Sequence, residues 1–217
     1  MKSKHMSVVG AAALLALAAA SAQGAFYAQI TDTSTWSGDP SSVLTVSVGG
    51  QDLTSGEIVG LYQFNNSFWG ICLSPWGLVD YAKHSYGFEQ SPPALNSPAF
   101  VPGGLAAAES TFEAVLPGIT TKEQAWALFG AVYTEAFGAT VSFTPQGVVD
   151  GLPAIYAHDL SERSRLRATV MVPNPPTGQG TAGQQFLVDP VPDGANTMAA
   201  LGAAFALVGV LRHKRKV

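Results

Sequence analysis

The chain has 217 residues, with 11 Lys and Arg against 15 Asp and Glu, and its formal net charge is −4 at pH 7. Between residues 23 and 192, five basic residues stand against 14 acidic ones. This central part therefore has a net charge near −9 and should repel nucleic acid and anionic lipid head groups. The single cysteine, Cys72, excludes an internal disulfide, a zinc site built on cysteine pairs and a haem attachment motif.

The first 22 residues have the pattern of a secretory signal peptide. A basic N-terminal segment precedes an apolar stretch at residues 8–20, which is too short for a comfortable transmembrane helix. Ala20 and Ala22 then form a small-x-small cleavage site. We predict cleavage after Ala22, with Ala25 as a second candidate and an uncleaved anchor as the alternative.

Segments with strand character follow. Residues 43–48 alternate Val or Leu with Ser and Thr before the turn at Gly49-Gly50. Residues 57–64 and 68–73 are expected to form a β-hairpin around a short Asn-Asn-Ser turn. A further short strand is predicted at 81–88. Cys72 lies in the second hairpin strand, where an apolar neighbourhood predicts a buried and inert thiol.

Two helices are predicted in the middle of the chain. The first covers residues 105–116, is rich in Ala and Glu, and is ended by Pro-Gly. The second covers residues 122–137. Thr121 and Gln124 have capping-box spacing at its start, and Gly138 is a natural C-terminal stop.

Strands resume after the second helix. They are predicted at residues 140–143 and 167–172, with a turn at 150–153 between them. Residues 173–190 form a Pro/Gly-rich connection that contains a possible last strand at 184–188.

This order of elements predicts the fold class. Strands, a helical insertion and further strands indicate a mainly β domain over residues 23–172, with a β-sandwich or jelly-roll-like arrangement and one or two packed helices. A C-terminal transmembrane helix is predicted in addition.

Residues that could support catalysis are few. The central part has two histidines, His84 and His158, without the spacing of a zinc hydrolase. Asp159 follows His158, but no Gly-x-Ser-x-Gly nucleophile elbow accompanies the pair, so a surface histidine is expected. No catalytic residue, metal or cofactor is therefore predicted. A cryptic hydrolase of extracellular polysaccharide remains an alternative, and it requires His84 or His158 to face a cleft with a carboxylate within reach.

Other charged residues are interpreted as surface groups. Glu109, Glu113 and Glu135 have helical spacing and are expected on solvated faces rather than in a glycosidase pair. Arg163, Arg165 and Arg167 alternate with uncharged residues, which would place them on one face of a solvated edge strand. Contact of this face with an acidic polymer is the alternative.

The last 27 residues have three parts in a row. The motif Val191-Pro192-Asp193-Gly194 precedes an apolar stretch at 195–211. This stretch would span about 25 Å as a helix, at the short end for a bilayer core. A basic segment follows at once, containing Arg212, Lys214, Arg215 and Lys216. Basic residues favour the cytoplasmic side, so the preceding domain would face outward.

This tripartite end resembles the PEP-CTERM class of sorting signals, and most closely its VPDSG-CTERM variant, although Gly194 replaces the usual Ser. The resemblance implies export by the secretion translocon in a Gram-negative bacterium, anchoring of the precursor in the inner membrane, and processing by an exosortase-like membrane protease. The expected function is that of a non-enzymatic protein of the cell envelope or of the extracellular, biofilm or exopolysaccharide-associated matrix. Extracellular polysaccharide is a possible partner.

A second resemblance offers another function. Proteins of this class often carry a Phe-Cys-Val-Asp-like strand and a Gln-x-Ala-Ile-Trp-like helix, similar to thioester domains of bacterial surface adhesins. The strand motif would correspond to Ile71-Cys72-Leu73, and the Ala-Ile-Trp part of the helix motif to Ala127-Leu128-Phe129. The glutamine position of the motif then falls on Ala125, so that Gln124 is displaced from it by one residue. The alternative that follows is a thioester-type adhesin in which Cys72 and Gln124 form the reactive bond.

Overall fold

The computed structural model describes residues 26–54, 59–76, 81–89, 92–95, 97–173 and 184–189. Apart from Phe26, these residues belong to one compact unit that runs from Tyr27 to Pro190. The predicted signal peptide and the predicted sorting signal, including its apolar stretch, lie outside the described residues. Within the described part of the chain, no helix combines the length and the apolar character needed to cross a bilayer.

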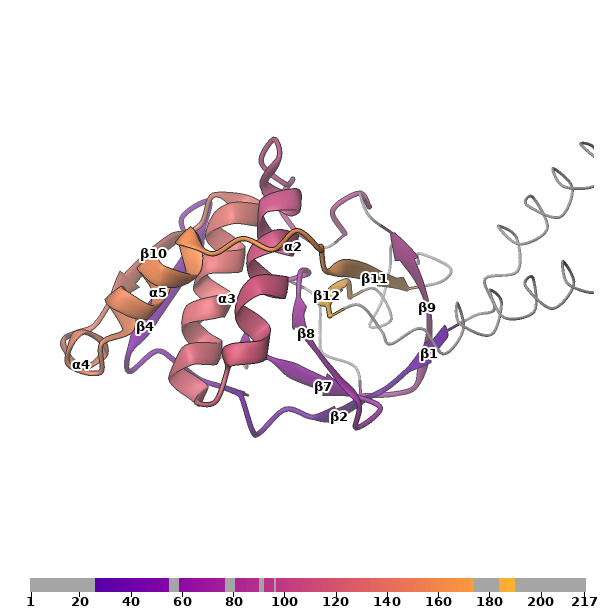
Figure 1. The fold of residues 1–217 in the computed structure, drawn as a ribbon, viewed down its shortest axis with the longest axis horizontal. Coiled ribbons are helices and arrows are strands. Elements are labelled where there is room, and N and C mark those ends of the chain that lie inside the picture. Colours follow the sequence, from indigo (N-terminus) through magenta and orange to yellow (C-terminus); the bar gives the residue numbers. More distant parts are fainter. Residues whose placement is uncertain are drawn as a thin grey trace, which may run out of the picture. The chain divides into compact units, whose positions relative to one another are not determined.

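Seven strands form the main antiparallel sheet, in the order β1-β9-β11-β12-β8-β7-β2 (Figure 1). Their bounds are Phe26–Ala28 (β1), Ile30–Asp32 (β2), Tyr62–Phe64 (β7), Phe68–Cys72 (β8), His84–Glu89 (β9), Thr169–Pro173 (β11) and Phe186–Val188 (β12). The two edge strands, β1 and β2, are separated in the chain by Gln29 alone, so the sheet is nearly closed.

The predicted hairpin is confirmed by β7 and β8. They pair in antiparallel register, with Phe64 opposite Phe68. The loop between these paired residues is Asn65-Asn66-Ser67. Asn65 and Asn66 have φ values of 51° and 53°, as at the central positions of a type I′ turn, and the Ser67 N–H donates to the Phe64 carbonyl oxygen at 2.9 Å. Asparagine tolerates this backbone region better than most residues, which explains why these two positions can form the turn.

The centre of the sheet is tightly packed where β8 meets the last strand. β12 lies between β8 and β11 and pairs with both. A Cβ atom added at Gly70 of β8 would lie 2.8 Å from Val188 Cγ1 and 2.9 Å from the Leu187 carbonyl oxygen. Glycine is therefore required for this close approach of the two strands.

Two smaller sheets accompany the main one. β4 (Leu44–Val48) lies between β5 (Gln51–Asp52) and β10 (Thr140–Phe143), and β3 (Ser37–Gly38) pairs with β6 (Val59–Gly60). Along β4 the burial alternates, because successive side chains of a strand point to opposite faces. The strands predicted at 43–48 and 140–143 are thus confirmed.

The helices pack together, with α3 in contact with both α2 and α5 (Figure 1). The bounds are Gly104–Val115 (α2), Leu116–Gly118 (the 3₁₀ helix η1), Lys122–Phe137 (α3), Pro145–Val149 (α4) and Leu152–Ser161 (α5). The molecule is therefore mainly β with a group of helices, which confirms the predicted fold class at this level.

The ends of α3 follow the prediction. Thr121 accepts a hydrogen bond from the Gln124 backbone, the Gln124 side chain accepts from the Thr121 backbone, and Gly138 closes the helix in the left-handed region with a φ of 66°. Most of α3 is buried, and Leu128 and Val132 are fully enclosed in the core that the helices share with the strands.

The segment after β10 differs from the prediction. Residues 150–153 were expected to form only a turn, whereas they contain the start of α5, with Gly151 as N-cap at a φ of 77° and Pro153 in the first turn of the helix. Proline is favoured there, because the first N–H groups of a helix have no partner within the helix. Arg163, Arg165 and Arg167 follow α5 in irregular structure, and β11 begins only at Thr169, so these arginines are not on an edge strand.

Candidate functional site

Cys72 lies at the end of β8 and is buried, as predicted. The Ser74 backbone N–H donates to its sulfur at 3.3 Å, and the thiol donates to the Ser74 carbonyl oxygen at 3.6 Å. Burial raises the pKa of the Cys72 thiol to about 12. The thiol is therefore protonated at neutral pH and has little nucleophilic character.

Gln124 has a different set of partners. Its side-chain oxygen accepts from the Thr120 N–H at 2.7 Å, from the Thr121 N–H at 3.1 Å and from the Thr120 hydroxyl at 3.0 Å. Further along α3, the Tyr133 hydroxyl donates to the Cys72 carbonyl oxygen at 2.7 Å. Gln124 is nine residues earlier, about 13 Å along the helix axis. The structure thus does not bring the proposed thioester pair together.

The two histidines have unlike surroundings. His84 begins β9, and its ring lies edge-on to that of Tyr86, with 6.3 Å between the ring centroids. His158 is in α5, on the rim of a groove that residues from α2, η1, α3 and α5 enclose. The sequence predicted a surface histidine, and the side chain of His158 is indeed 67% exposed, but the groove next to it was not predicted.

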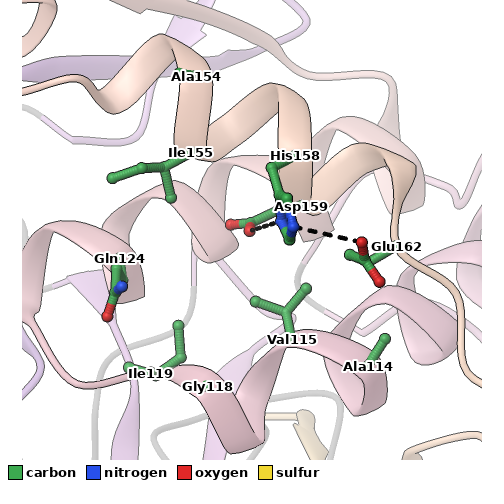
Figure 2. A pocket seen from close by; sticks show the side chains of 10 residues that line it. All are labelled: Ala114, Val115, Gly118, Ile119, Gln124, Ala154, Ile155, His158, Asp159 and Glu162. Carbon is green, nitrogen blue, oxygen red and sulfur yellow. Dashed lines mark ion pairs between the residues drawn. The ribbon is translucent and has the colours of Figure 1, made fainter.

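The groove has a volume of about 540 Å³ (Figure 2). Ten residues line it: Ala114, Val115, Gly118, Ile119, Gln124, Ala154, Ile155, His158, Asp159 and Glu162. Its aliphatic side chains are from α2, α5 and Ile119 just after η1, and the charged residues are all from α5 and the residue after it. Such a volume and lining are typical of small-molecule sites.

His158 is flanked by two carboxylates. Its Nδ1 is 3.6 Å from Asp159 Oδ1, and its Nε2 is 3.4 Å from Glu162 Oε1, one helical turn later. Figure 2 shows both of these contacts as dashed lines at one end of the groove. His158 thus lies at the rim of a cleft with two carboxylates near it, at separations longer than the roughly 2.6–3.2 Å of a catalytic hydrogen bond.

Asp159 is the most unusual group of the groove. The residue is only 2% exposed, and its Oδ2 atom is buried without a hydrogen-bond donor. Burial raises the pKa of its carboxyl group to about 6, which the adjacent His158 partly opposes. A buried carboxylate without a full set of donors is costly, so this one is a candidate for binding a ligand.

The carboxylates of Glu109 in α2 and Glu135 in α3 do not line the groove. Glu109 and Glu135 were expected on solvated faces, but Glu109 is 1% exposed and the side chain of Glu135 is 8% exposed. The cause is the segment after α5, which crosses α2: the Ser164 N–H donates to the Ser110 carbonyl oxygen, and the Ala168 N–H donates to the Glu109 carbonyl oxygen. The prediction of a solvated face was wrong for these two residues.

Electrostatics differ between these carboxylates. Burial raises the pKa of Glu109 to about 7, an effect that Arg167 partly opposes. Burial also raises the pKa of Glu135, although this carboxylate forms an ion pair with Arg163 at 2.5 Å. Glu113 interacts with Asp189 just after β12, and burial is the main cause that raises the pKa of both carboxyl groups.

No metal centre emerges from these groups. The described residues contain no set of three or more His, Cys, Asp or Glu side chains placed to hold a metal ion.

Sequence reasoning missed the groove because it depends on α5. A helix starting at Leu152 places Ile155, Asp159 and Glu162 on one face, since residues four and three positions apart lie one above another. The helix-start signal was present in Gly151 and Pro153, but the same pair also indicates a turn.

The predicted processing sites cannot be placed in this arrangement. The signal-peptide residues Ala20 and Ala22, the motif from Val191 to Gly194 and the basic residues after position 211 lie outside the described residues. Comparison with known proteins adds no identity: no protein-family model, no curated protein and no solved structure matches this chain.

Proposed function

We propose that the chain is an exported, non-enzymatic protein of the cell envelope or extracellular polymeric matrix, delivered by the secretion translocon and processed by an exosortase-like membrane protease. The carrying observation is the extent of the compact unit. It begins at Tyr27, shortly after the predicted cleavage site at Ala22, and it ends at Pro190, directly before the motif that starts at Val191. In the sequence, the predicted signals thus flank the folded domain.

The position of the last strand supports the same proposal. β12 ends at Val188 and is held on both sides by β11 and β8. Removal of residues 191–217 would leave every pairing of this strand intact, so a cut at the motif would yield a complete domain. The acidic charge of the central part fits a soluble extracellular body, with polysaccharide as a possible partner and nucleic acid excluded. A sandwich or jelly-roll-like classification of the domain stays a prediction.

The test is localisation and intact mass in a Gram-negative host with an exosortase-type system. The full chain is expected to lose both ends and to reach the envelope or the medium, whereas a chain without residues 191–217 should be mislocalised. A matched variant, Asp193→Ala with Pro192→Ala, alters only the motif and should accumulate as a membrane-bound precursor. Equal localisation of all three chains, with residues 191–217 still present in the full chain, would overturn the proposal.

A second candidate is a hydrolase of extracellular polysaccharide, and the geometry of His158 between Asp159 and Glu162 favours it. Release of reducing ends from matrix polysaccharide, lost in His158→Ala and retained in His84→Ala, would support this candidate. Absence of release by the wild-type protein would count against it and leave the non-enzymatic proposal in place.

A further inference from the structure

The groove between α2, η1, α3 and α5 has the features of a binding site independently of any sorting of the chain. Its aliphatic side is formed by Val115 of α2, Ile119 directly after η1 and Ile155 of α5. Near the middle of the labelled residues, Figure 2 shows the Asp159 carboxyl group pointing toward the space that their side chains enclose. An apolar cavity with a few convergent polar groups is the usual form of a small-molecule site.

The Asp159 carboxylate indicates which hydrogen-bonding group the polar end of a ligand would provide. His158 faces Oδ1, whereas Oδ2 is buried and has no donor in the described structure. A carboxylate oxygen in this position requires an N–H or O–H donor, because leaving it without one has a free-energy cost. The negative charges of Asp159 and nearby Glu162 favour a donor that is also cationic.

The lining also distinguishes between kinds of cation. None of the ten described residues around the groove is aromatic. Quaternary ammonium groups have no N–H and are typically recognised by aromatic rings. A primary or secondary ammonium group, in contrast, can donate directly to a carboxylate.

We propose that this groove binds a primary or secondary aliphatic amine in its protonated form, with the ammonium group donating to Asp159 Oδ2 and the aliphatic part lying against Val115, Ile119 and Ile155. This ligand class goes beyond the proposed sorting function and does not depend on it.

The isoleucine methyl groups allow a direct test with the full-length chain. The sequence has five isoleucines, of which Ile119 and Ile155 line the groove, whereas Ile30 and Ile71 are buried in the main sheet. In NMR titrations with hexylammonium, the methyl signals of Ile119 and Ile155 should shift, and those of Ile30 and Ile71 should not. Hexyltrimethylammonium, hexanol and hexanoate share the alkyl chain, but none combines a positive charge with an N–H donor. The affinity of each should therefore be lower than that of hexylammonium by about tenfold or more.

Two variants separate the carboxylate from the overall charge. Asp159→Asn removes the charge in the groove and should weaken hexylammonium binding by about tenfold or more. Asp150→Asn removes one charge from an exposed carboxylate that accepts from Gln146 outside the groove, and it should leave binding unchanged. If Asp159→Asn does not fold, the ligand series on the wild-type chain still decides the question.

Three results would overturn the proposal. The first is the absence of shifts at Ile119 and Ile155 with hexylammonium. The second is equal affinity for hexylammonium and its trimethylated analogue, which would show that no N–H donor is needed. The third is unchanged hexylammonium affinity in a folded Asp159→Asn protein.

Discussion

The Tyr133 hydroxyl donates a hydrogen bond of 2.7 Å to the Cys72 carbonyl oxygen and thereby ties the middle of α3 to the end of β8. Both residues are buried, and Tyr133 is among the largest side chains that are almost fully enclosed. A buried carbonyl group needs a donor, so this contact supplies both packing and hydrogen bonding between the helices and the main sheet.

Removal of this hydroxyl should destabilise the domain. Tyr133→Phe keeps the ring but leaves the Cys72 carbonyl oxygen without its donor, and we expect the free energy of unfolding to fall by about 1–3 kcal/mol. Urea unfolding followed by tryptophan fluorescence measures this change. The matched control is Tyr156→Phe, which removes a hydroxyl that is 2.9 Å from Thr134 Oγ1 in a half-buried position and should have a smaller effect. Equal losses in the two variants would contradict this interpretation.

The close contact of β8 and β12 predicts different effects of alanine at two strand glycines. Gly70→Ala would force a Cβ against Val188 and Leu187, so we expect a loss of about 1–3 kcal/mol or misfolding. Gly87→Ala on β9 meets no atom within 4 Å, and alanine should be neutral or slightly stabilising there. Thermal unfolding of both variants tests the prediction, and a stable Gly70→Ala protein would show that the strands can separate.

The buried carboxyl groups predict an acidic optimum of stability. The folded pKa values of Glu109, about 7, and Asp159, about 6, are raised above 4.5 and 3.8, so the folded state binds more protons than the unfolded state between these limits. The stability that these two groups contribute to the folded state is therefore fully present below about pH 4 and is lost as the pH rises through 6 to 7. Asp32 acts in the opposite direction. Hydrogen bonds from Thr35 and Ser34 lower its pKa to about 2, so its ionised form favours folding above about pH 4.

Glu109→Gln isolates the largest of these effects. At pH 8 the variant should be more stable than the wild type by up to about 3 kcal/mol, and at pH 4 the two should be similar. Urea unfolding at a series of pH values measures the difference. Glu89→Gln, at an exposed position of β9, controls for the change in net charge. A wild-type stability that rises steadily from pH 4 to pH 8 would contradict the assignment.

Cys72 should be unreactive in the native protein and chemically unmodified. Its burial and raised pKa predict slow alkylation by iodoacetamide under native conditions and rapid alkylation in urea. Intact mass should show no loss of ammonia, since the amide of Gln124 is engaged with Thr120 and Thr121. A mass lower by one ammonia, together with resistance to alkylation in urea, would restore the thioester adhesin.

Local signals were sufficient for several elements. The capping box at Thr121 and the glycine at position 138 gave the correct bounds of α3, and the Asn-Asn turn gave the β7–β8 hairpin. In each case, the deciding residues are close together in the sequence, so their interactions depend little on the rest of the fold.

The missed features depend on distant segments. The spacing of Glu109 along α2 is that of an exposed face, and only the chain that returns at Ser164 and Ala168 buries it. The groove likewise needs α5 to lie beside η1 and the start of α3, and no local pattern specifies this contact. The order of β9, β11, β12 and β8 in the sheet depends on non-local pairing in the same way.

The place of β12 inside the sheet has a consequence for the order of events during biogenesis. β8, which pairs with β12 on one side, ends at Cys72. The sheet nevertheless cannot connect β8 to β11 until β12, which ends at Val188, is available. Pairing across such a long stretch of chain is slow, because the ends of a long loop must first meet. In an exported chain, the central sheet would therefore close only after nearly the whole domain had crossed the membrane, at the moment when the predicted C-terminal signal reaches it.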